Sequence, residues 1–359
     1  MTRRTINLYF LRRYIVSFIS TLIAVFALTY LIDMIEVSRR GASQDVSFAT
    51  IATISALRVP AFIEQAFPFI ILFSSIFTLV SLNRKLELVI ARAGGMSVWQ
   101  IIAPFALGSF LIGVLSVGLY NPIAAAAQAQ SARLQTATAG VVTQSNDRSP
   151  WLRQTGKGVE SIIGAKAVSD GGATLGGVTA FIMRQEGVVS ERIDAAQARL
   201  ENGEWVIEDP LVTRVGSPPV RESRVTIPTT LLPEFIEQRL ANPDAISIWE
   251  LGGKIEVARS LGYNADAFAM RFNALIARPA LFVAMTLVAA TVAVRYTRLG
   301  QSSGTIVGGV AAGFVLYVIT FLAQALGSNS VIPAVVAAWF PVVAAGLFGT
   351  TILLHQEDG

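Results

Sequence analysis

"LNRKLELVIARAGG", residues 82–95, lies between two long apolar runs and carries four charged side chains. Its apolar residues follow the i, i+3, i+4, i+7 spacing of one helix face, and they are Leu86, Val89, Ile90 and Ala93. Two glycines follow, Gly94 and Gly95, and glycine is the usual residue where a helix ends. The stretch predicts a short amphipathic helix between two membrane spans, either resting on lipid headgroups or docking a soluble partner.

The composition of the whole chain is that of a membrane protein. Hydrophobic residues make up 53% of the 359 residues, charged residues make up 14%, and the mean hydropathy is +0.58. A bilayer core about 30 Å thick requires roughly 20 apolar residues per helix. Six stretches meet this requirement: 14–35, 56–82, 98–121, 267–294, 304–325 and 331–354. The first is too long for a signal peptide, so we expect it to be a retained span.

The distribution of cations predicts how the spans are oriented. With the N-terminus in the cytoplasm, the cations on the inside are Arg3, Arg4, Arg12, Arg13, Arg84, Lys85, Arg92, Arg295 and Arg298. Only Arg39 and Arg40 fall in the short outside loops. Since inner loops carry the excess of lysine and arginine, both termini and residues 82–95 are predicted to be cytoplasmic.

Between the third and fourth spans, residues 141–240 are polar and their apolar residues approach a period of two. Asn202-Gly203 is a tight-turn signal inside an alternating segment, and it predicts a hairpin with Trp205 and Ile207 facing a core. Further strands are predicted at 159–167, 174–184 and 220–228. The segment is therefore expected to form a small sheet or sandwich outside the membrane.

These patterns predict an α-helical integral membrane protein with six transmembrane helices and an inserted all-β domain. Residues 1–140 hold spans one to three with the connecting helix at about 83–95, residues 141–240 form the β domain, and residues 241–359 hold a further helix and spans four to six. That further helix is expected to start with Asn242 as its N-cap and Pro243 as its first residue. Its apolar face would carry Ile248, Leu251, Ile255 and Ala258.

The residue inventory argues against catalysis by this chain. It has no cysteine, and its only histidine, His355, stands in the terminal HQEDG, so thiol chemistry and a histidine-based triad are not expected. The G-x-x-x-x-G-K-[ST] phosphate-binding loop is also missing. We expect no catalytic residue, no metal and no cofactor in this chain, and a nucleotide would be handled by another chain.

Ionisable side chains inside spans are costly and are therefore functional candidates. Near the outer end of span one, Arg39 and Arg40 follow Glu36 by three and four residues, a spacing that permits ion pairs along one helix face. The same arginines could instead face phosphate groups, whose oxygens suit the forked guanidinium. Asp33 and Arg58 are further candidates on spans one and two.

Span four carries two arginines on one face, Arg271 and Arg278. They could bind phosphate, extend to headgroups or pair with Glu64 of span two. Span five has a run of small residues that allows close helix approach, either within the chain or with a partner. These residues are Gly304, Gly308, Gly309 and Gly313.

Three segments resemble one family of transporters. LNRKLELVIARAGGMSVWQI is similar to the coupling-helix region of the lipopolysaccharide export permeases, the LptF/LptG family. NPDAISIWEL resembles the segment by which that family returns from its periplasmic domain, and AGFVLYVITFLAQALGSNSVIPAVVAAWFP resembles its fifth and sixth spans. The layout of spans and β-rich domain matches over nearly the whole chain, and NPDAIS and GFVLYV are more similar to LptG than to LptF.

The resemblance implies a permease subunit in the bacterial inner membrane that extracts lipopolysaccharide. It implies a heterodimer with an LptF-like permease over a cytoplasmic ATPase dimer, which uses ATP and Mg. It also implies a periplasmic β-jellyroll that passes lipid to LptC-like and LptA-like bridge proteins. No nucleic-acid partner is expected.

The resemblance also suggests which residues act. Glu87 matches the coupling-helix carboxylate that contacts the ATPase, and Arg92, Leu86 and Ile90 accompany it. The expected lipid-binding residues are Arg39, Arg40, Arg58 and Arg271. Because the family often has a basic residue where Asp33 stands, a phosphate contact at that point is expected to move to Arg39 or Arg58.

Three other classes of function fit the sequence less well. A secondary transporter would more typically show paired repeats and a broken-helix ion site. A lipid-modifying enzyme would need a nucleophile, carboxylate or metal cluster near the outer surface. A structural scaffold of the envelope would not require the helix at 83–95.

Overall fold

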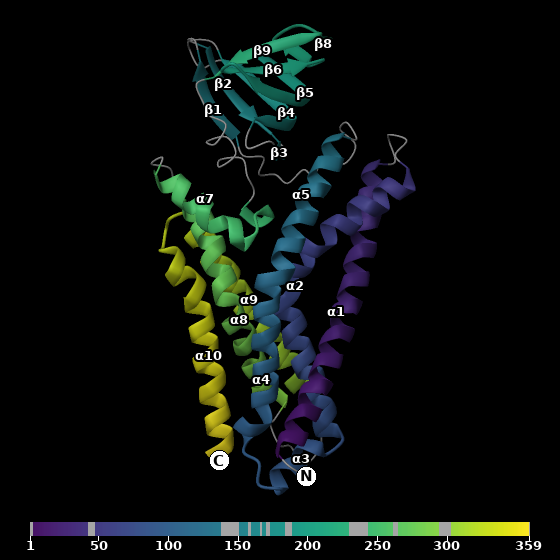
Figure 1. Ribbon diagram of the computed structural model, residues 1–359, viewed down its shortest axis with the longest axis vertical. Helices are drawn as coiled ribbons and strands as arrows, with labels where there is room; N and C mark the ends of the chain where they lie inside the picture. Colours follow the sequence, from purple (N-terminus) through teal and green to yellow (C-terminus); the bar gives the residue numbers. More distant parts are fainter. Residues whose placement is uncertain are drawn as a thin grey trace. The chain divides into compact units, whose positions relative to one another are not determined.

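The computed structural model describes residues 3–41, 47–137, 151–156, 159–165, 167–169, 173–183, 189–229, 243–260, 265–293 and 303–358. The chain divides into two compact units, whose elements are labelled in Figure 1. The span unit comprises Met1–Leu31, Val59–Ala125 and Ile246–Gly359. The sheet unit comprises Ile32–Arg58 and Ala126–Ala245. Several predicted residues, among them Asn242, Arg295 and Arg298, lie outside the described ranges.

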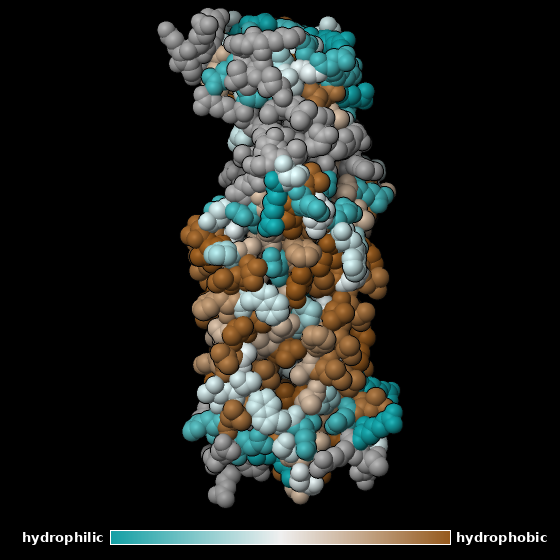
Figure 2. Space-filling view, turned by 60° about the vertical axis from the view of Figure 1, so that its left-hand side comes forward, coloured by the Kyte–Doolittle hydropathy of each residue, from teal (hydrophilic) through white to brown (hydrophobic). Residues whose placement is uncertain are grey.

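Within the described residues, six helices are long and apolar enough to cross a membrane, which confirms the prediction of six spans. The first two are α1 (Arg3–Gly41) and α2 (Phe48–Arg84), and the third runs through α4 (Val98–Leu115), the π-helical turn η1 (Ser116–Tyr120) and α5 (Asn121–Ala137). The others are α8 (Asp266–Ala293), α9 (Ser303–Ser328) and α10 (Ala334–Asp358). On the face shown in Figure 2, hydrophobic side chains gather over the spans, as contact with lipid requires.

Small residues bring the spans into close contact. A Cβ atom on Gly113 of α4 would lie 2.5 Å from the Cα of Pro279 on α8, so these helices meet backbone to backbone. On α9, Gly309 faces Val292 and Gly313 faces Leu72. At these two positions the predicted small-residue face therefore packs within the chain. The surroundings of Gly304 lie outside the described residues.

A buried network of hydroxyl groups joins four spans. The Tyr14 hydroxyl of α1 lies 2.7 Å from Ser109 Oγ of α4, which lies 2.5 Å from Thr286 Oγ1 of α8. Thr286 Oγ1 is also 3.2 Å from Ser75 Oγ of α2. All four side chains are fully buried. Such a network satisfies polar groups in an apolar interior and fixes the relative positions of the helices that carry them.

The described part of the sheet unit forms a nine-stranded antiparallel sheet, which confirms the predicted β insertion. Its strands are β1 (Trp151–Gly156), β2 (Val159–Gly164), β3 (Ala167–Ser169), β4 (Thr174–Met183), β5 (Val189–Glu201), β6 (Glu204–Glu208), β7 (Leu211–Arg214), β8 (Val220–Arg221) and β9 (Arg224–Pro228). The main path runs β1-β2-β4-β5-β6-β9, while β3 pairs with β4 and β7 pairs with β5 and β8.

The predicted hairpin is formed by β5 and β6. Asn202 and Gly203 have φ angles of 51° and 77°, the left-handed backbone that a two-residue hairpin turn requires. Trp205 and Ile207 are buried in the sheet core, and the indole of Trp205 donates a hydrogen bond to Gln154 Oε1 at 3.4 Å. The inward orientation predicted for these two residues is confirmed.

The helix after the sheet begins later than predicted. Pro243–Ala245 form a separate 3-10 turn, and α7 runs from Ile248 to Ser260. The backbone N–H of Leu251 donates to Ser247 O, the bond that opens the helix. The predicted start at Pro243 was wrong because this proline belongs to the short turn instead of the first turn of α7. Its predicted apolar face is correct, since Leu251 and Ala258 are fully buried.

Candidate functional site

The first candidate surface is helix α3, Glu87–Ala93, at the end of the span unit where both termini lie (Figure 1). Leu88 and Ala91 are its buried residues. Leu86 precedes the helix with a left-handed φ of 62°, and its side chain is 60% exposed, while that of Ile90 is 69% exposed. The predicted amphipathic helix is present, but Leu86 lies outside it and the predicted apolar stripe leaves two large side chains uncovered.

Glu87 faces the chain's own first helix. Its Oε1 lies 3.7 Å from Arg13 Nη2 of α1, and its Oε2 is buried without a hydrogen-bond partner among the described residues. Arg13 is held in turn by Tyr9, whose hydroxyl accepts from Arg13 Nε at 3.1 Å and whose ring lies 5.5 Å below the guanidinium. Arg92 is exposed. The sequence pattern gave no sign of the Arg13 contact.

Two ion pairs occupy the parts of α1 and α2 that belong to the sheet unit. Asp33 and Arg58 are both buried, with Arg58 Nη2 3.3 Å from Asp33 Oδ1. Arg39 Nη2 donates to Glu36 Oε2 at 2.7 Å, and this pair is much more exposed. The pairing permitted by the Glu36–Arg39 spacing is therefore formed, whereas the Asp33–Arg58 pair was missed. The side chain of Arg40 lies outside the described residues.

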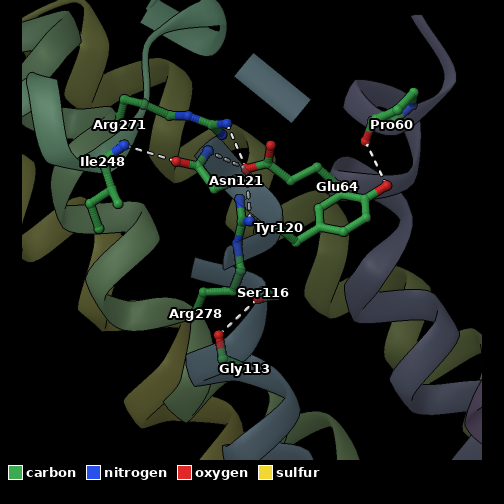
Figure 3. Close-up of polar contacts among 9 residues, drawn as sticks. All are labelled: Pro60, Glu64, Gly113, Ser116, Tyr120, Asn121, Ile248, Arg271 and Arg278. Carbon is green, nitrogen blue, oxygen red and sulfur yellow. Dashed lines mark hydrogen bonds and ion pairs between the residues drawn. The ribbon is translucent and has the colours of Figure 1, made fainter. Parts of the chain in front are cut away.

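A further group of charges, buried in the span unit, surrounds Glu64 of α2 (Figure 3). Glu64 is only 3% exposed. Its Oε1 accepts hydrogen bonds from Arg271 Nη2 and Arg278 Nη1 of α8, each at 2.8 Å, and from Asn121 Nδ2 at 3.0 Å. Of the alternatives left open for the two arginines, pairing with Glu64 is the one formed. Each bond involves an ionised partner in a water-poor site, where such bonds are at their strongest.

The π-helical turn η1 brings the third span into this group. Tyr120, its last residue, donates from its hydroxyl to Pro60 O at 3.1 Å and packs edge-on against Phe67. Asn121 follows directly, is fully buried and also accepts from the backbone N–H of Ile248 at 2.8 Å. Isolated π-helical turns occur frequently at functional sites. The Asn-Pro pair at 121–122, inside an otherwise apolar stretch, was the available sequence signal for Asn121, and it was missed.

The described residues contain no group of three or more histidine, aspartate and glutamate side chains that could hold a metal ion. The site is therefore a set of ion pairs and hydrogen bonds between helices, together with an exposed apolar surface at α3. Such an arrangement can bind partners and position helices.

The chain matches one family model over nearly its whole length. The model described as "Lipopolysaccharide export system permease LptF/LptG" covers residues 8–355. A search of curated proteins found no match to the chain.

Proposed function

Because the chain belongs to the LptF/LptG family of lipopolysaccharide export permeases, we propose that it is the LptG-like subunit of a permease heterodimer driven by a separate ATPase. As a permease it is a transmembrane part of the export system and is not itself catalytic. The segments NPDAIS and GFVLYV support the LptG assignment. The ATPase would bind the ATP and Mg, since the sequence has no phosphate-binding loop of the required spacing.

The proposed docking site for the ATPase is the α3 surface. Leu86 and Ile90 are exposed apolar side chains, and this pair is the observation that carries the proposal. Burying a large aliphatic side chain contributes about 1.5 to 3 kcal/mol, so the pair could anchor a partner. Arg92 and Glu87 would contribute charge contacts, and the ATPase would compete with Arg13 for the Glu87 carboxylate.

The proposed orientation has α3 and both termini in the cytoplasm and the sheet unit's β domain in the periplasm. The cations near the termini and around α3 support it, because cytoplasmic ends of spans carry the excess of arginine and lysine. In this orientation the β domain would pass lipopolysaccharide to LptC-like and LptA-like bridge proteins.

The proposed lipid contacts are Arg39, Arg40, Arg58 and Arg271, whose guanidinium groups suit the phosphates of the lipid headgroup. Two of them already hold carboxylates, since Arg58 pairs with Asp33 and Arg271 with Glu64. A lipid phosphate would therefore compete with a carboxylate at these two positions, whereas Arg39 is the more exposed candidate.

The docking proposal is tested with Ile90→Asp in the intact complex. We expect association with the ATPase to weaken by about tenfold or more. The reason is that a charge replaces an apolar side chain that the ATPase would bury on docking, a contact worth at least about 1.4 kcal/mol. The measurement is co-purification of the ATPase in mild detergent together with ATP turnover. Val215→Asp is the matched control, since it places the same charge on an exposed apolar residue between β7 and β8. Parent-like association of Ile90→Asp would rule out docking through α3.

A further inference from the structure

Asn121 joins the Glu64 group to helix α7. Its Nδ2 donates to Glu64 Oε1 at 3.0 Å, and its Oδ1 accepts from the backbone N–H of Ile248 at 2.8 Å. Ile248 is the first residue of α7, and the first N–H groups of a helix have no partner within that helix. A carboxylate can only accept hydrogen bonds, so Glu64 forces the amide to turn its nitrogen towards α2 and its oxygen towards α7.

Further contacts fasten the start of α7 to the third span. The indole of Trp249 donates to Gly118 O of η1 at 3.4 Å, and Val117 packs with Leu251 in one apolar cluster. The third span is held to α2 by the hydrogen bond from Tyr120 to Pro60. The beginning of α7, the π-helical turn and the middle of α2 therefore form one connected group.

The sequence connects this group to two functional parts of the chain. Helix α2 ends at Arg84 and α3 begins at Glu87, so the span that carries Glu64 continues almost directly into the proposed docking helix. Among the described residues, α7 is the first α-helix after the β domain in the sequence. We propose that Glu64 is a positioning residue for transport, because it holds the Asn121 amide in the orientation that binds the start of α7. A displacement of α2 is thereby transmitted to the segment that follows the β domain in the sequence. The inference rests on the proposed docking of the ATPase at α3.

The arginines of α8 make the carboxylate of Glu64 essential to this arrangement. Arg271 and Arg278 both donate to the same oxygen, Glu64 Oε1. Glu64→Gln keeps the size of the side chain but takes away the negative charge that these two cations share. It also offers an amide that can point its nitrogen at Asn121, which releases the orientation of the Asn121 amide.

The first test measures hydrogen exchange at the Ile248 amide in the full-length chain in lipid nanodiscs. Glu64→Gln should raise its exchange rate about tenfold or more, since the Asn121 amide is no longer held with its oxygen towards the Ile248 N–H. The pair Glu64→Gln with Asn121→Asp exchanges the positions of carboxylate and amide at constant total charge, and it should restore most of the protection. Asn273→Ala is the control, because this amide on α8 bonds to Ala269 O of its own helix.

The second test measures ATP turnover and lipopolysaccharide delivered to a photo-reactive residue in the β domain, in vesicles holding the complete complex. Glu64→Gln should leave ATPase binding intact and reduce lipid delivered per ATP about tenfold, and the exchanged pair should recover delivery. Because the exchanged pair also restores a negative charge near the two arginines, thermal unfolding of both variants is compared to separate lost delivery from a general loss of stability. Should Glu64→Gln fail to fold, Asn121→Ala replaces it, because it leaves both arginine bonds to Glu64 in place.

Parent-like exchange at Ile248 and parent-like delivery in Glu64→Gln would overturn the inference, as would failure of the exchanged pair to recover either property. A parent chain that binds no ATPase would overturn the proposed function, and the inference with it. The two failures are distinguishable because the second is visible in the parent chain alone.

Discussion

At the scale of single residues, each buried carboxylate of α1 and α2 faces an arginine. Asp33 pairs with Arg58, and Glu64 pairs with two arginines of α8. A lone charge in an apolar interior costs several kcal/mol, so each carboxylate depends on its partner and each partner depends on it. Removal of one member leaves the other as an uncompensated buried charge.

We expect Asp33→Asn to lower the free energy of unfolding by about 3 to 5 kcal/mol, because Arg58 would keep its buried charge opposite a neutral amide. Glu36→Gln, one helical turn away, is the control and should change stability by less than about 1 kcal/mol, since its partner Arg39 is largely exposed. Thermal unfolding of both variants in the same detergent measures the difference. Equal stability of the two variants would contradict the buried-pair argument.

At the scale of elements, the sequence was informative where local chemistry determines structure. Asn202-Gly203 marked the hairpin because its backbone requirement is satisfied by these two residues alone. The start of α7 was mistaken because Pro243 suits a first helical turn and a 3-10 turn equally well. Asn121 was missed because its partners, Glu64 and Ile248, are 57 and 127 residues away in sequence. Contacts of this kind follow from helix packing, which hydropathy patterns do not specify.

The contact between α4 and α8 gives a prediction at this scale. Gly113→Ala should cost about 1 to 3 kcal/mol, because the new methyl group would lie 2.5 Å from the Pro279 backbone and the helices would have to separate. Gly346→Ala on α10 is the control, since no described atom of another element lies within 4 Å of the position that its methyl group would take. In the Gly346→Ala variant, the higher helix propensity of alanine should stabilise the protein by up to about 1 kcal/mol. In thermal unfolding, we expect Gly113→Ala to lower the stability of the protein and Gly346→Ala to raise it. A change in the same direction for both variants would contradict the packing argument.

At the scale of the whole molecule, the two units have separate apolar cores. The core of the sheet is built from buried residues of β2, β4, β5, β6, β7 and β9 together with Ala165, and Trp205 is its largest buried side chain. The six spans have their own core, built around residues such as Phe105 and Phe282. A domain with its own core can in principle fold alone.

We therefore expect residues 141–240 to fold in isolation, with a circular dichroism spectrum dominated by strand and a cooperative unfolding transition. Trp205→Ala in this fragment should lower the free energy of unfolding by about 3 to 5 kcal/mol. Val215→Ala, at an exposed position, should have little effect. A mainly helical spectrum would contradict the prediction.

The π-helical turn η1 sets the direction in which the side chains of α5 point independently of those of α4, although both belong to the third span. Each residue of an α-helix advances by about 100°, so deleting one residue from 116–120 would rotate Asn121 by roughly that angle away from Glu64. The packing of Gly113 against Pro279 would stay where it is, because it precedes the turn. A change of length alone can therefore remove the hydrogen bond between Asn121 and Glu64 while the packing between α4 and α8 is kept.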